Sequence, residues 1–491
     1  MNLYSHQQRG AQILMQKPSF LLAWEMGVGK SRTSLAAAQF LYERQKIDRL
    51  LILAPSSVGF AWREELHKLS LEGFNHLLLR YDAKQKKFFA DEVGGNLNGK
   101  RRLPIGIVGY GMLQGRFDSS HAKVLAQWCA SGKAALICDE SSFLKSRAAK
   151  QTKSAYEIAC ACLYRWLLSG TPVANSELDL WSQVSVMSPS RDRGPLRGIN
   201  NFYHFRAKYG YLAGFKGRQW FRDEAKLRDL QQRMEPFVSR VEKRDCLDLP
   251  LKSFTVREVA LKLETWKLYQ ELKRDALMTL GEGDVRIEPN AAVRLMRLSQ
   301  ITSGHVGNVQ GMNGPEESEG HDISSEKLDW LVEALTEDEL AAERAVIIWC
   351  RWRRERERLA SRFVKSGHPF TQIFGGQSEK QRDEAIKSFQ ENAGVPRCLL
   401  AQPHAGGYGL NLTVAHVAVY LSNDYSYVTR VQSEDRCHRI GQKNPVTYID
   451  VLATGPKGER TIDHAVLRAL REKQSIAEWT CAAWRKALEE E

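Results

Sequence analysis

Short apolar runs of four or five residues recur in two stretches of the chain, one before residue 182 and one after residue 324. Each run is rich in Leu, Ile, Val or Ala and is followed by a turn signal and a segment with helical periodicity. This alternation is typical of parallel strands joined by crossover helices, and it predicts an α/β protein with two parallel sheets. The runs are Phe20–Ala23, Leu50–Ala54, Ile105–Val108, Ala135–Cys138, Tyr164–Leu168, Ala345–Trp349, Thr371–Phe374, Cys398–Ala401, Val417–Leu421 and Thr447–Val451.

The intervening part of the chain has a different pattern, irregular and helical, with amphipathic stretches near 262–280 and 291–302. It is expected to be a helical insertion between two α/β lobes. The predicted parts are a first lobe over 1–182, helical protrusions and a linker over 183–324, a second lobe over 325–455 and a C-terminal helical brace over 456–491.

Composition narrows the class of protein. With 43% hydrophobic and 26% charged residues in 491, the chain is ordinary globular protein and not a disordered or collagen-like one. The 71 Lys and Arg exceed the 58 Asp and Glu, and the net charge of +13 favours an anionic partner such as nucleic acid, with a merely basic surface as the alternative. Nine Cys without a CxxC pair indicate neither a zinc knuckle nor a disulfide framework. No apolar run is long enough to span a bilayer, so we expect no membrane association and a cytoplasmic protein.

The segment WEMGVGKS at 24–31 follows the first predicted strand and precedes a helix-compatible stretch. Strand, glycine loop and helix in this order are typical of a phosphate cradle, in which backbone N–H groups face the anion. Lys30 would contact the β and γ phosphates of ATP, and Ser31 would hold Mg²⁺. Trp24 stands where the strict pattern has its first Gly, so a chance glycine-rich turn is the alternative. The candidate nucleotide ligands of the loop are Gly27, Val28, Gly29, Lys30 and Ser31.

Two acidic residues, Asp139 and Glu140, follow a predicted buried strand. Ligands of open α/β sheets bind at the carboxyl ends of the strands. Asp139 would hold Mg²⁺, and Glu140 would act as the general base on the attacking water. The alternative is a pair of helix N-cap residues.

Two arginines near the C-terminus, Arg436 and Arg439, are three residues apart and would share one face if the stretch is helical. Guanidinium groups suit the negative charge of a transferring phosphoryl group, although a solvated helix with surface charges is the alternative. If the second lobe supplies these arginines, ATP lies in the cleft between the lobes.

Taken in order, these segments resemble the Snf2 family of superfamily 2 helicase-like ATPases, from about Leu3 to Gln442. The matching segments are LYSHQ at 3–7, WEMGVGKS at 24–31, LILAPSSV at 51–58, DESSFLKS at 139–146, LLSGTPVANSELDLWS at 167–182, SRVEKRDCLDLPLK at 239–252, VIIWCRW at 346–352, GGYGLNLT at 406–413 and QSEDRCHRIGQ at 432–442.

The resemblance implies two RecA-like parallel-sheet lobes, with Snf2-type helical protrusions between them, that use ATP and Mg²⁺. It places Gln7 at the adenine, Gly409 and Gln432 at the nucleotide, and it gives Ser169 and Thr171 the task of coupling the ATP site to nucleic acid. The implied catalytic residues are Lys30, Glu140, Arg436 and Arg439.

The chain departs from the family pattern at three places. Trp24 replaces an acidic residue, Ser141 and Ser142 stand where relatives often carry Ala or Gly and His or Gln, and Tyr425 begins a Tyr-Ser-Tyr in place of Trp-Asn-Pro. None of these departures removes a residue expected to contact phosphate or metal.

The resemblance also implies a track, double-stranded DNA. We expect an ATP-dependent DNA translocase of compact prokaryotic or viral type that displaces or remodels bound protein or branched DNA. It would be a monomer when isolated, with a protein partner supplying its targeting. Basic residues over 208–244 and 351–358 could contact DNA phosphates, or could belong to solvated surfaces. A strand-separating DNA or RNA helicase and an ATP-gated DNA clamp subunit of a nuclease or methyltransferase are the alternatives.

Overall fold

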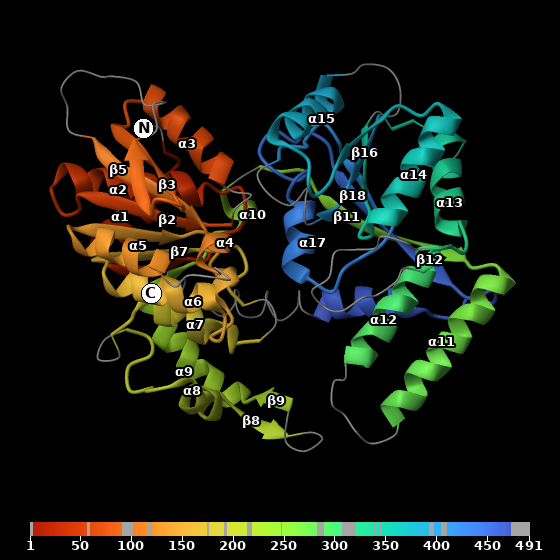
Figure 1. The fold of residues 1–491 in the computed structure, drawn as a ribbon, viewed down its shortest axis with the longest axis horizontal. Helices are drawn as coiled ribbons and strands as arrows, with labels where there is room; N and C mark the ends of the chain where they lie inside the picture. The colour runs from red at the N-terminus through yellow and green to blue at the C-terminus, as the bar shows by residue number, and fades with distance from the viewer. Residues whose placement is uncertain are drawn as a thin grey trace. The chain divides into compact units, whose positions relative to one another are not determined.

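The chain forms two compact units, which divide between Asp248 and Leu249. Each unit is built on its own parallel sheet, so the predicted fold class is confirmed (Figure 1). The computed structural model describes residues 3–472 except 56–58, 91–101, 115–119, 174–175, 191–193, 214–218, 247, 282–288, 307–320, 338–339, 341, 344, 392–396 and 404–409.

The sheet of unit 1 has the strand order β10-β1-β7-β6-β2-β5-β3-β4. Every neighbouring pair is parallel except β3 with β4. The carboxyl ends of the parallel strands therefore meet at one edge. The strands are β1 (Ser19–Leu22), β2 (Arg49–Ala54), β3 (His76–Asp82), β4 (Lys87–Ala90), β5 (Leu103–Gly109), β6 (Ala134–Cys138), β7 (Tyr164–Leu168) and β10 (Val238–Ser239).

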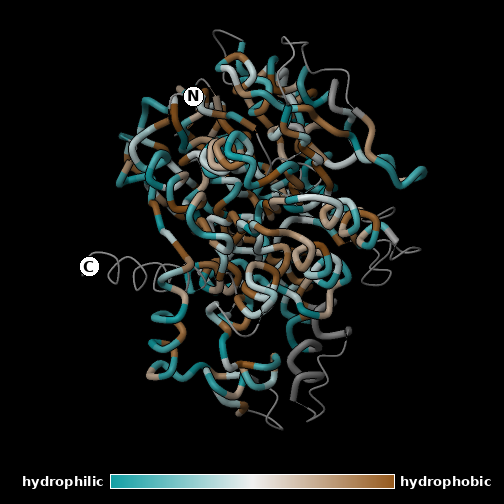
Figure 2. The backbone as a smooth tube through the Cα atoms, turned by 90° about the vertical axis from the view of Figure 1, so that its left-hand side faces the viewer, coloured by the Kyte–Doolittle hydropathy of each residue, from teal (hydrophilic) through white to brown (hydrophobic). Residues whose placement is uncertain are grey.

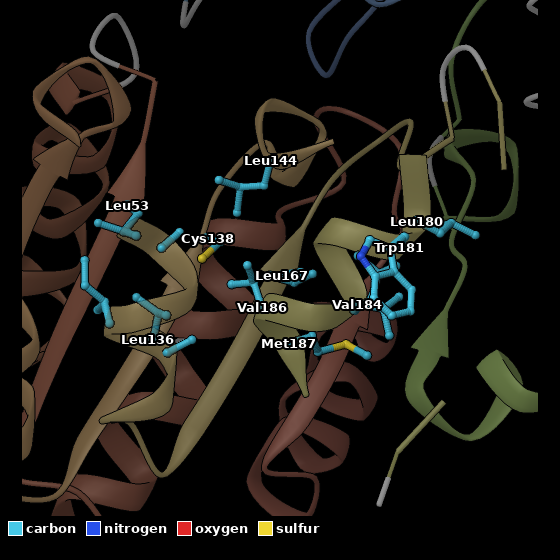
Figure 3. Close-up of a cluster of buried hydrophobic side chains, with 14 of the residues drawn as sticks. Leu53, Leu136, Cys138, Leu144, Leu167, Leu180, Trp181, Val184, Val186 and Met187 are labelled. Carbon is cyan, nitrogen blue, oxygen red and sulfur yellow. The ribbon is translucent and has the colours of Figure 1, made fainter. Parts of the chain in front are cut away.

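Helices cover both faces of this sheet because alternate strand residues point to opposite sides. Leu50 and Ile52 pack with α1, α2 and α3, whereas Leu51 and Leu53 pack with α5, α6 and α7. Figure 3 shows part of the core that contains Leu51 and Leu53, where Leu53 lies beside Cys138 of the neighbouring strand β6 and Trp181 belongs to α7. The helices are α1 (Ser5–Gln16), α2 (Lys30–Glu43), α3 (Gly59–Leu71), α4 (Tyr110–Leu113), α5 (Ser120–Ala130), α6 (Lys150–Cys160) and α7 (Asp179–Met187).

A small helical subdomain follows α7 in unit 1. It carries a two-stranded antiparallel sheet, and the chain then returns to the main sheet as β10. Its elements are α8 (Phe202–Tyr209), β8 (Gly210–Ala213), β9 (Gln219–Arg222), α9 (Glu224–Met234) and, after β10, α10 (Lys243–Cys246).

The sheet of unit 2 has the order β11-β18-β17-β14-β16-β15, and all its neighbouring pairs are parallel. Val346 and Ile348 face α13 and α14, whereas Ile347 and Trp349 face α15. The strands are β11 (Lys252–Ala260), β14 (Ala345–Trp349), β15 (Phe370–Ile373), β16 (Arg397–Ala401), β17 (Val417–Tyr420) and β18 (Val446–Thr454).

Two long helices, α11 and α12, project from the sheet of unit 2 as a pair (Figure 1). Their base packs with the end of β18 and with the last described helix, over 462–472. The helices and short strands of unit 2 are α11 (Leu263–Gly281), α12 (Pro289–Thr302), β12 (His305–Val306), β13 (His321–Asp322), α13 (Glu326–Thr336), α14 (Arg353–Ser366), α15 (Glu379–Glu391) and α17 (Tyr427–Glu434).

All ten strands predicted from the apolar runs are present, and the amphipathic stretches form α11 and α12. The expectation of an irregular and helical stretch over 183–324 missed the six strands β8 to β13, of which β10 and β11 join the two main sheets. β10 has only two residues, and β11 is a largely polar edge strand that pairs with β18 far along the chain. Neither has the buried apolar pattern that identifies an inner strand. The four-part domain division stays a prediction.

Apolar residues are spread over many short elements. In Figure 2 hydrophobic and hydrophilic segments alternate along the tube. Across the part of the chain that the structure describes, no helix has the length and hydropathy needed to cross a membrane.

Candidate nucleotide site

The loop between β1 and α2 takes a backbone conformation that requires glycine. Gly27 has φ +82° and Gly29 has φ +89°, in the left-handed region that residues with a Cβ rarely adopt. A Cβ on Gly29 would also clash with the side-chain amide of Gln7. The loop leads directly into α2, which begins at Lys30. Its shape is therefore that of a phosphate cradle at a helix N-terminus.

Helix α1 holds the outer side of this loop. The side-chain amide of Gln7 accepts a hydrogen bond from the Tyr4 N–H at 3.0 Å and donates to the Val28 carbonyl at 3.3 Å. A ring nitrogen of His6 lies 2.9 Å from the same carbonyl oxygen. Gln7 is buried, so the predicted adenine-reading residue is part of the wall of the loop.

The Lys30 ammonium lies inside the loop. It donates hydrogen bonds to the backbone carbonyls of Trp24 at 2.9 Å and Glu25 at 3.1 Å. Its charge also acts on the carboxylate of Asp139. Ser31 occupies the first turn of α2, next to Lys30. The structure therefore brings Lys30, the predicted phosphate residue of the loop, near the acidic residue after β6.

The Asp139 carboxylate is buried and held on both oxygens. The Trp62 indole N–H donates to Oδ2 at 2.8 Å, and the Glu140 backbone N–H donates to Oδ1 at 2.9 Å. Burial raises the pKa of Asp139, and the hydrogen bond from Trp62 and the charge of Lys30 oppose that rise. No local sequence pattern signals the contact of Trp62 with Asp139.

Glu140 has an unusual backbone for a residue with a side chain, φ 46° and ψ 57°. Such left-handed conformations are costly outside glycine and concentrate at functional sites. The backbone on either side is held, because the Tyr110 hydroxyl donates to the Asp139 carbonyl at 2.8 Å and the Phe143 N–H donates to the Glu140 carbonyl at 2.9 Å. The residue after Asp139 is thus turned out of the strand direction.

Ser169 and Thr171 lie between the glycine loop after β1 and the acidic pair Asp139 and Glu140 after β6. They follow β7, which is the strand between β1 and β6 in the parallel sheet. The Ser169 N–H donates to the Leu22 carbonyl at 3.1 Å, and its hydroxyl accepts from the Thr171 N–H at 3.2 Å. The segment predicted to couple the ATP site to nucleic acid therefore touches the strand that leads into the loop.

A side chain missed by the sequence analysis, Gln183 of α7, links the acidic segment to this coupling segment. Its amide oxygen accepts from the Ser141 hydroxyl at 2.8 Å, and its amide nitrogen donates to the Pro172 carbonyl at 2.6 Å. Ser141, one of the departures from the family pattern, is fully buried in this contact.

In unit 2 the two predicted arginines, Arg436 and Arg439, follow α17. They do not share the face of a helix, because α17 ends at Glu434. Both arginines instead form hydrogen bonds with the segment that contains Leu410 and Leu412. The Leu412 N–H donates to the Arg436 carbonyl at 3.0 Å, and the Arg439 guanidinium donates to the Leu410 carbonyl at 2.9 Å. Burial lowers the pKa of Arg439, a group that stays charged in proteins.

The turn that replaces the expected helix is held by Gln442. Its side-chain amide donates to the carbonyls of Ala415 at 2.9 Å, Thr413 at 3.2 Å and Cys437 at 3.2 Å. Gln432 of α17 is buried too, and its side-chain nitrogen has no hydrogen-bond partner among the described residues. Gly409, also predicted to contact nucleotide, lies outside the described residues.

The possible metal ligands at the nucleotide site suit a magnesium ion that is shared with phosphate better than a metal ion bound by protein side chains alone. Within the described ranges no group of three or more His, Cys, Asp or Glu side chains could hold a metal. Mg²⁺ commonly takes only one or two carboxylates and completes its shell with phosphate oxygens and water. The buried carboxylate of Asp139 and the hydroxyl of Ser31, which follows Lys30 in α2, are donors of the kind that this mode uses.

Fold and site together define a class: a parallel α/β unit with a glycine phosphate loop and a neighbouring strand-end carboxylate, followed by a second parallel α/β unit. Comparison with protein families narrows the class. The SNF2-related domain matches residues 6–305, and the helicase conserved C-terminal domain matches residues 326–441. The chain therefore belongs to the SNF2 family, and its two sheets are the RecA-like lobes that the resemblance implied.

The chain is similar to parts of longer proteins. An uncharacterized ATP-dependent helicase of Mycoplasma pneumoniae is 26% identical over 486 residues, which cover 98% of this chain and 42% of that protein. The ISWI chromatin-remodeling complex ATPase CHR11 of Arabidopsis thaliana is 24% identical over 456 residues, covering 91% of this chain and 40% of that protein. The chain thus spans less than half the length of these relatives. A solved structure, the Sulfolobus solfataricus SWI2/SNF2 ATPase core in complex with dsDNA, has TM-score 0.40 and 21% identity and covers 100% of this chain and 96% of that chain.

Proposed function

We propose that this chain hydrolyses ATP and uses the cycle to move along double-stranded DNA, displacing or remodelling bound protein or branched DNA. The observation that carries the proposal is the meeting of Lys30 and Asp139 at one edge of the sheet of unit 1. A phosphate cradle beside a strand-end carboxylate is the arrangement that phosphoryl transfer from a nucleoside triphosphate requires.

In this proposal the loop binds the triphosphate through its backbone N–H groups, and Gln7 recognises the adenine. Lys30 exchanges its two carbonyl partners for phosphate oxygens. Asp139 and Ser31 would hold Mg²⁺, which neutralises phosphate charge when bound. A carboxylate oxygen of Glu140 takes the proton of the attacking water.

Arg436 and Arg439 are assigned the stabilisation of negative charge on the transferring phosphoryl group. Gln432 and Gly409 are assigned contacts with the nucleotide. The family membership of the chain supports these roles, and so does the buried side-chain nitrogen of Gln432, which has no hydrogen-bond partner among the described residues. Because the arginines belong to unit 2 and Lys30 belongs to unit 1, hydrolysis would depend on the relative position of the units. Ser169 and Thr171 would couple the state of the ATP site to the binding of DNA.

The choice of DNA as the track is supported by the net charge of +13 and by a relative named as a chromatin-remodeling ATPase. Phosphate contacts from Lys and Arg supply sequence-independent affinity, which suits movement along a duplex. The proposed acting form is a monomer, with a protein partner supplying the targeting.

The test is steady-state ATP hydrolysis with no polymer, duplex DNA, single-stranded DNA and single-stranded RNA side by side at one salt concentration. Duplex DNA should stimulate hydrolysis most. In parallel, the protein should displace the third strand of a triplex while opening little of a forked duplex. Stronger stimulation by single-stranded RNA would contradict the DNA assignment, and efficient opening of the fork would indicate a strand-separating helicase.

A further inference from the structure

The segment that is proposed to couple the ATP site to DNA is fixed to the phosphate loop by a side chain from elsewhere in unit 1. We call residues Ser169–Pro172 the coupling segment. The Arg240 guanidinium donates to the Gly170 carbonyl at 3.0 Å and to the Ala23 carbonyl at 2.6 Å. Ala23 directly precedes the loop, and the Arg240 side chain is only 9% exposed. One buried guanidinium thus joins the coupling segment to the chain that enters the loop.

Gln183 of α7 joins the coupling segment to the acidic residues after β6. Its side-chain nitrogen donates to the Pro172 carbonyl at 2.6 Å and to the Asp179 carbonyl at 3.0 Å, and its side-chain oxygen accepts from the Ser141 hydroxyl at 2.8 Å. Because two carbonyl oxygens face the nitrogen, the amide has a single favourable orientation, and the Ser141 hydroxyl must be the donor. Gln183 and Ser141 are both fully buried, so water does not compete for these bonds.

Ser141 directly follows Glu140, the proposed general base. A short 3₁₀ helix over Ser141–Leu144 begins at this residue, and the Phe143 N–H donates to the Glu140 carbonyl at 2.9 Å. Glu140 itself has φ 46°, a conformation that persists only where the surrounding structure holds it. The hydrogen bond from Ser141 to Gln183 is one of the contacts that hold this turn. Gln183 therefore connects the backbone next to the base with the coupling segment.

A glutamine with a purely structural role is the simpler account of this position. The residues of α7 from Leu180 to Met187 are all buried, and an apolar side chain would fill the same space. A buried amide costs free energy unless its hydrogen bonds are made, and a fully bonded one fixes the arrangement of the segments that it joins. Besides the Asp179 carbonyl of its own helix, Gln183 bonds one group of the acidic segment and one of the coupling segment. These partners favour a role in the reaction.

We propose that Gln183 is a positioning residue that links the general base to the coupling segment, so that the binding of DNA changes the position of Glu140. The inference rests on the proposed stimulation of ATP hydrolysis by DNA, and it names the contact through which that stimulation passes. Gln183 acts through Ser141 and the backbone of Glu140, and it is not assigned a contact with ATP.

The test is steady-state ATP hydrolysis by the full chain with and without saturating duplex DNA. Gln183→Met keeps the approximate size of the side chain and removes its donor and its acceptor. It should lower the DNA-stimulated kcat by about tenfold, the rate equivalent of one or two lost hydrogen bonds. The KM for ATP and the rate without DNA should stay within about threefold of the wild type, because Lys30, Asp139 and Glu140 are unchanged.

Gln151→Met is the matched control. Gln151 of α6 is also buried, and its side-chain nitrogen donates to the Phe143 carbonyl at 2.7 Å, in the same 3₁₀ helix. Among the described residues its side chain bonds only Phe143 and Gln114, both outside the coupling segment. Gln151→Met should therefore lose stability in thermal unfolding but keep full stimulation by DNA. An equal loss of stimulation in the Gln151 and Gln183 variants would assign the effect to the turn as a whole and overturn the proposal.

Ser141→Ala breaks the same link from its other end, and it serves as the second variant if Gln183→Met does not fold. It should lower the DNA-stimulated kcat to a similar extent. The double variant should be no slower than either single variant, because residues that act through one contact are not additive. Losses of stimulation that simply add in the double variant would overturn the link between the two side chains.

Failure of this inference and failure of the proposed function give different results. If duplex DNA does not stimulate hydrolysis by the wild-type chain, both are overturned. If DNA stimulates the wild type and the folded Gln183→Met and Ser141→Ala variants equally, this inference alone is overturned. A purely structural glutamine predicts that last result, with thermal stability lowered and the stimulation unchanged.

Discussion

At the scale of single residues, the candidate site depends on a few positions whose backbone or charge is unusual. Gly27 and Gly29 supply positive φ angles, and Glu140 takes a positive φ despite its side chain. Lys30 and Asp139 are both buried and lie close enough for the charge of one to alter the pKa of the other. Each of these features makes a substitution informative.

The two proposed chemical roles in unit 1 should separate in variants. Lys30→Ala should lose ATP hydrolysis together with much of the nucleotide affinity, because it removes a phosphate ligand. Glu140→Gln should keep the affinity for ATP and lose hydrolysis by roughly 10²- to 10⁴-fold, the usual contribution of a general base. Nucleotide titration and steady-state hydrolysis on each variant measure the two effects. Glu64→Gln on the exposed side of α3 is the control, and near wild-type turnover by Glu140→Gln would disprove the base assignment.

Gly29→Ala and Gly73→Ala form a matched pair. Both glycines have φ near +90°, so either alanine costs about 1–2 kcal/mol of folding free energy. Only the Cβ at position 29 would also clash, with the amide of Gln7, whereas nothing lies within 4 Å at position 73. We expect both variants to lose similar stability in thermal unfolding, but Gly29→Ala alone to lose nucleotide binding. Equal nucleotide affinity for the two would show that the contact of Gln7 with the loop is dispensable.

At the scale of elements, polar side chains join segments that the apolar cores only bring near one another. Asp463, in the helix over 462–472, is the clearest case in unit 2. Its carboxylate accepts from the Lys327 ammonium at 2.6 Å, the Thr302 hydroxyl at 2.8 Å and the Ala453 N–H at 3.0 Å. One side chain thus connects α13, α12 and β18. The pair of projecting helices is anchored to the sheet through this residue.

Breaking that anchor should destabilise unit 2. Asp463→Ala leaves the ammonium of Lys327, a residue that is 4% exposed, without this carboxylate, and such a change typically costs about 3–5 kcal/mol. Asp329→Ala removes an exposed ion pair with Arg362 and should cost less than about 1 kcal/mol. Urea unfolding of both variants, followed by tryptophan fluorescence, compares the two. Equal shifts of the unfolding midpoint would mean that the buried network adds nothing to the stability of unit 2.

At the scale of the whole molecule, the excess of basic residues is the property that bears most directly on the proposed binding of DNA. The net charge of +13 belongs to the full chain and cannot be assigned to one element. Such a charge attracts any polyanion, and the SNF2 family fold is what makes duplex DNA the proposed one.

Salt should therefore weaken the stimulation by DNA far more than the basal reaction. The DNA concentration that gives half-maximal stimulation should rise steeply between about 50 and 200 mM salt, since each neutralised phosphate contributes about −0.9 to the slope of log affinity against log salt. Hydrolysis without DNA, measured over the same range, is the control. A half-maximal concentration that does not change with salt would contradict binding through phosphate contacts.

Local chemistry was sufficient to predict most of the framework. The ten apolar runs became ten strands, because buried parallel strands must be continuously apolar and their length is short. The phosphate loop could also be predicted from the sequence, because only glycine readily adopts the backbone conformation that the loop needs. These features depend on neighbours in the chain, and the sequence carries their signal at each position.

Contacts between distant segments could not be predicted from the sequence. Trp62 reaches Asp139 across 77 positions and Trp24 reaches Ser239 across 215, and no periodicity relates such pairs. The strands β10 and β11 exist because an edge strand offers them hydrogen bonds, and the arginine segment turns because Gln442 binds carbonyls from three other positions. Which partner a polar side chain meets is decided by how sheets and helices pack. Packing is a property of the folded chain as a whole.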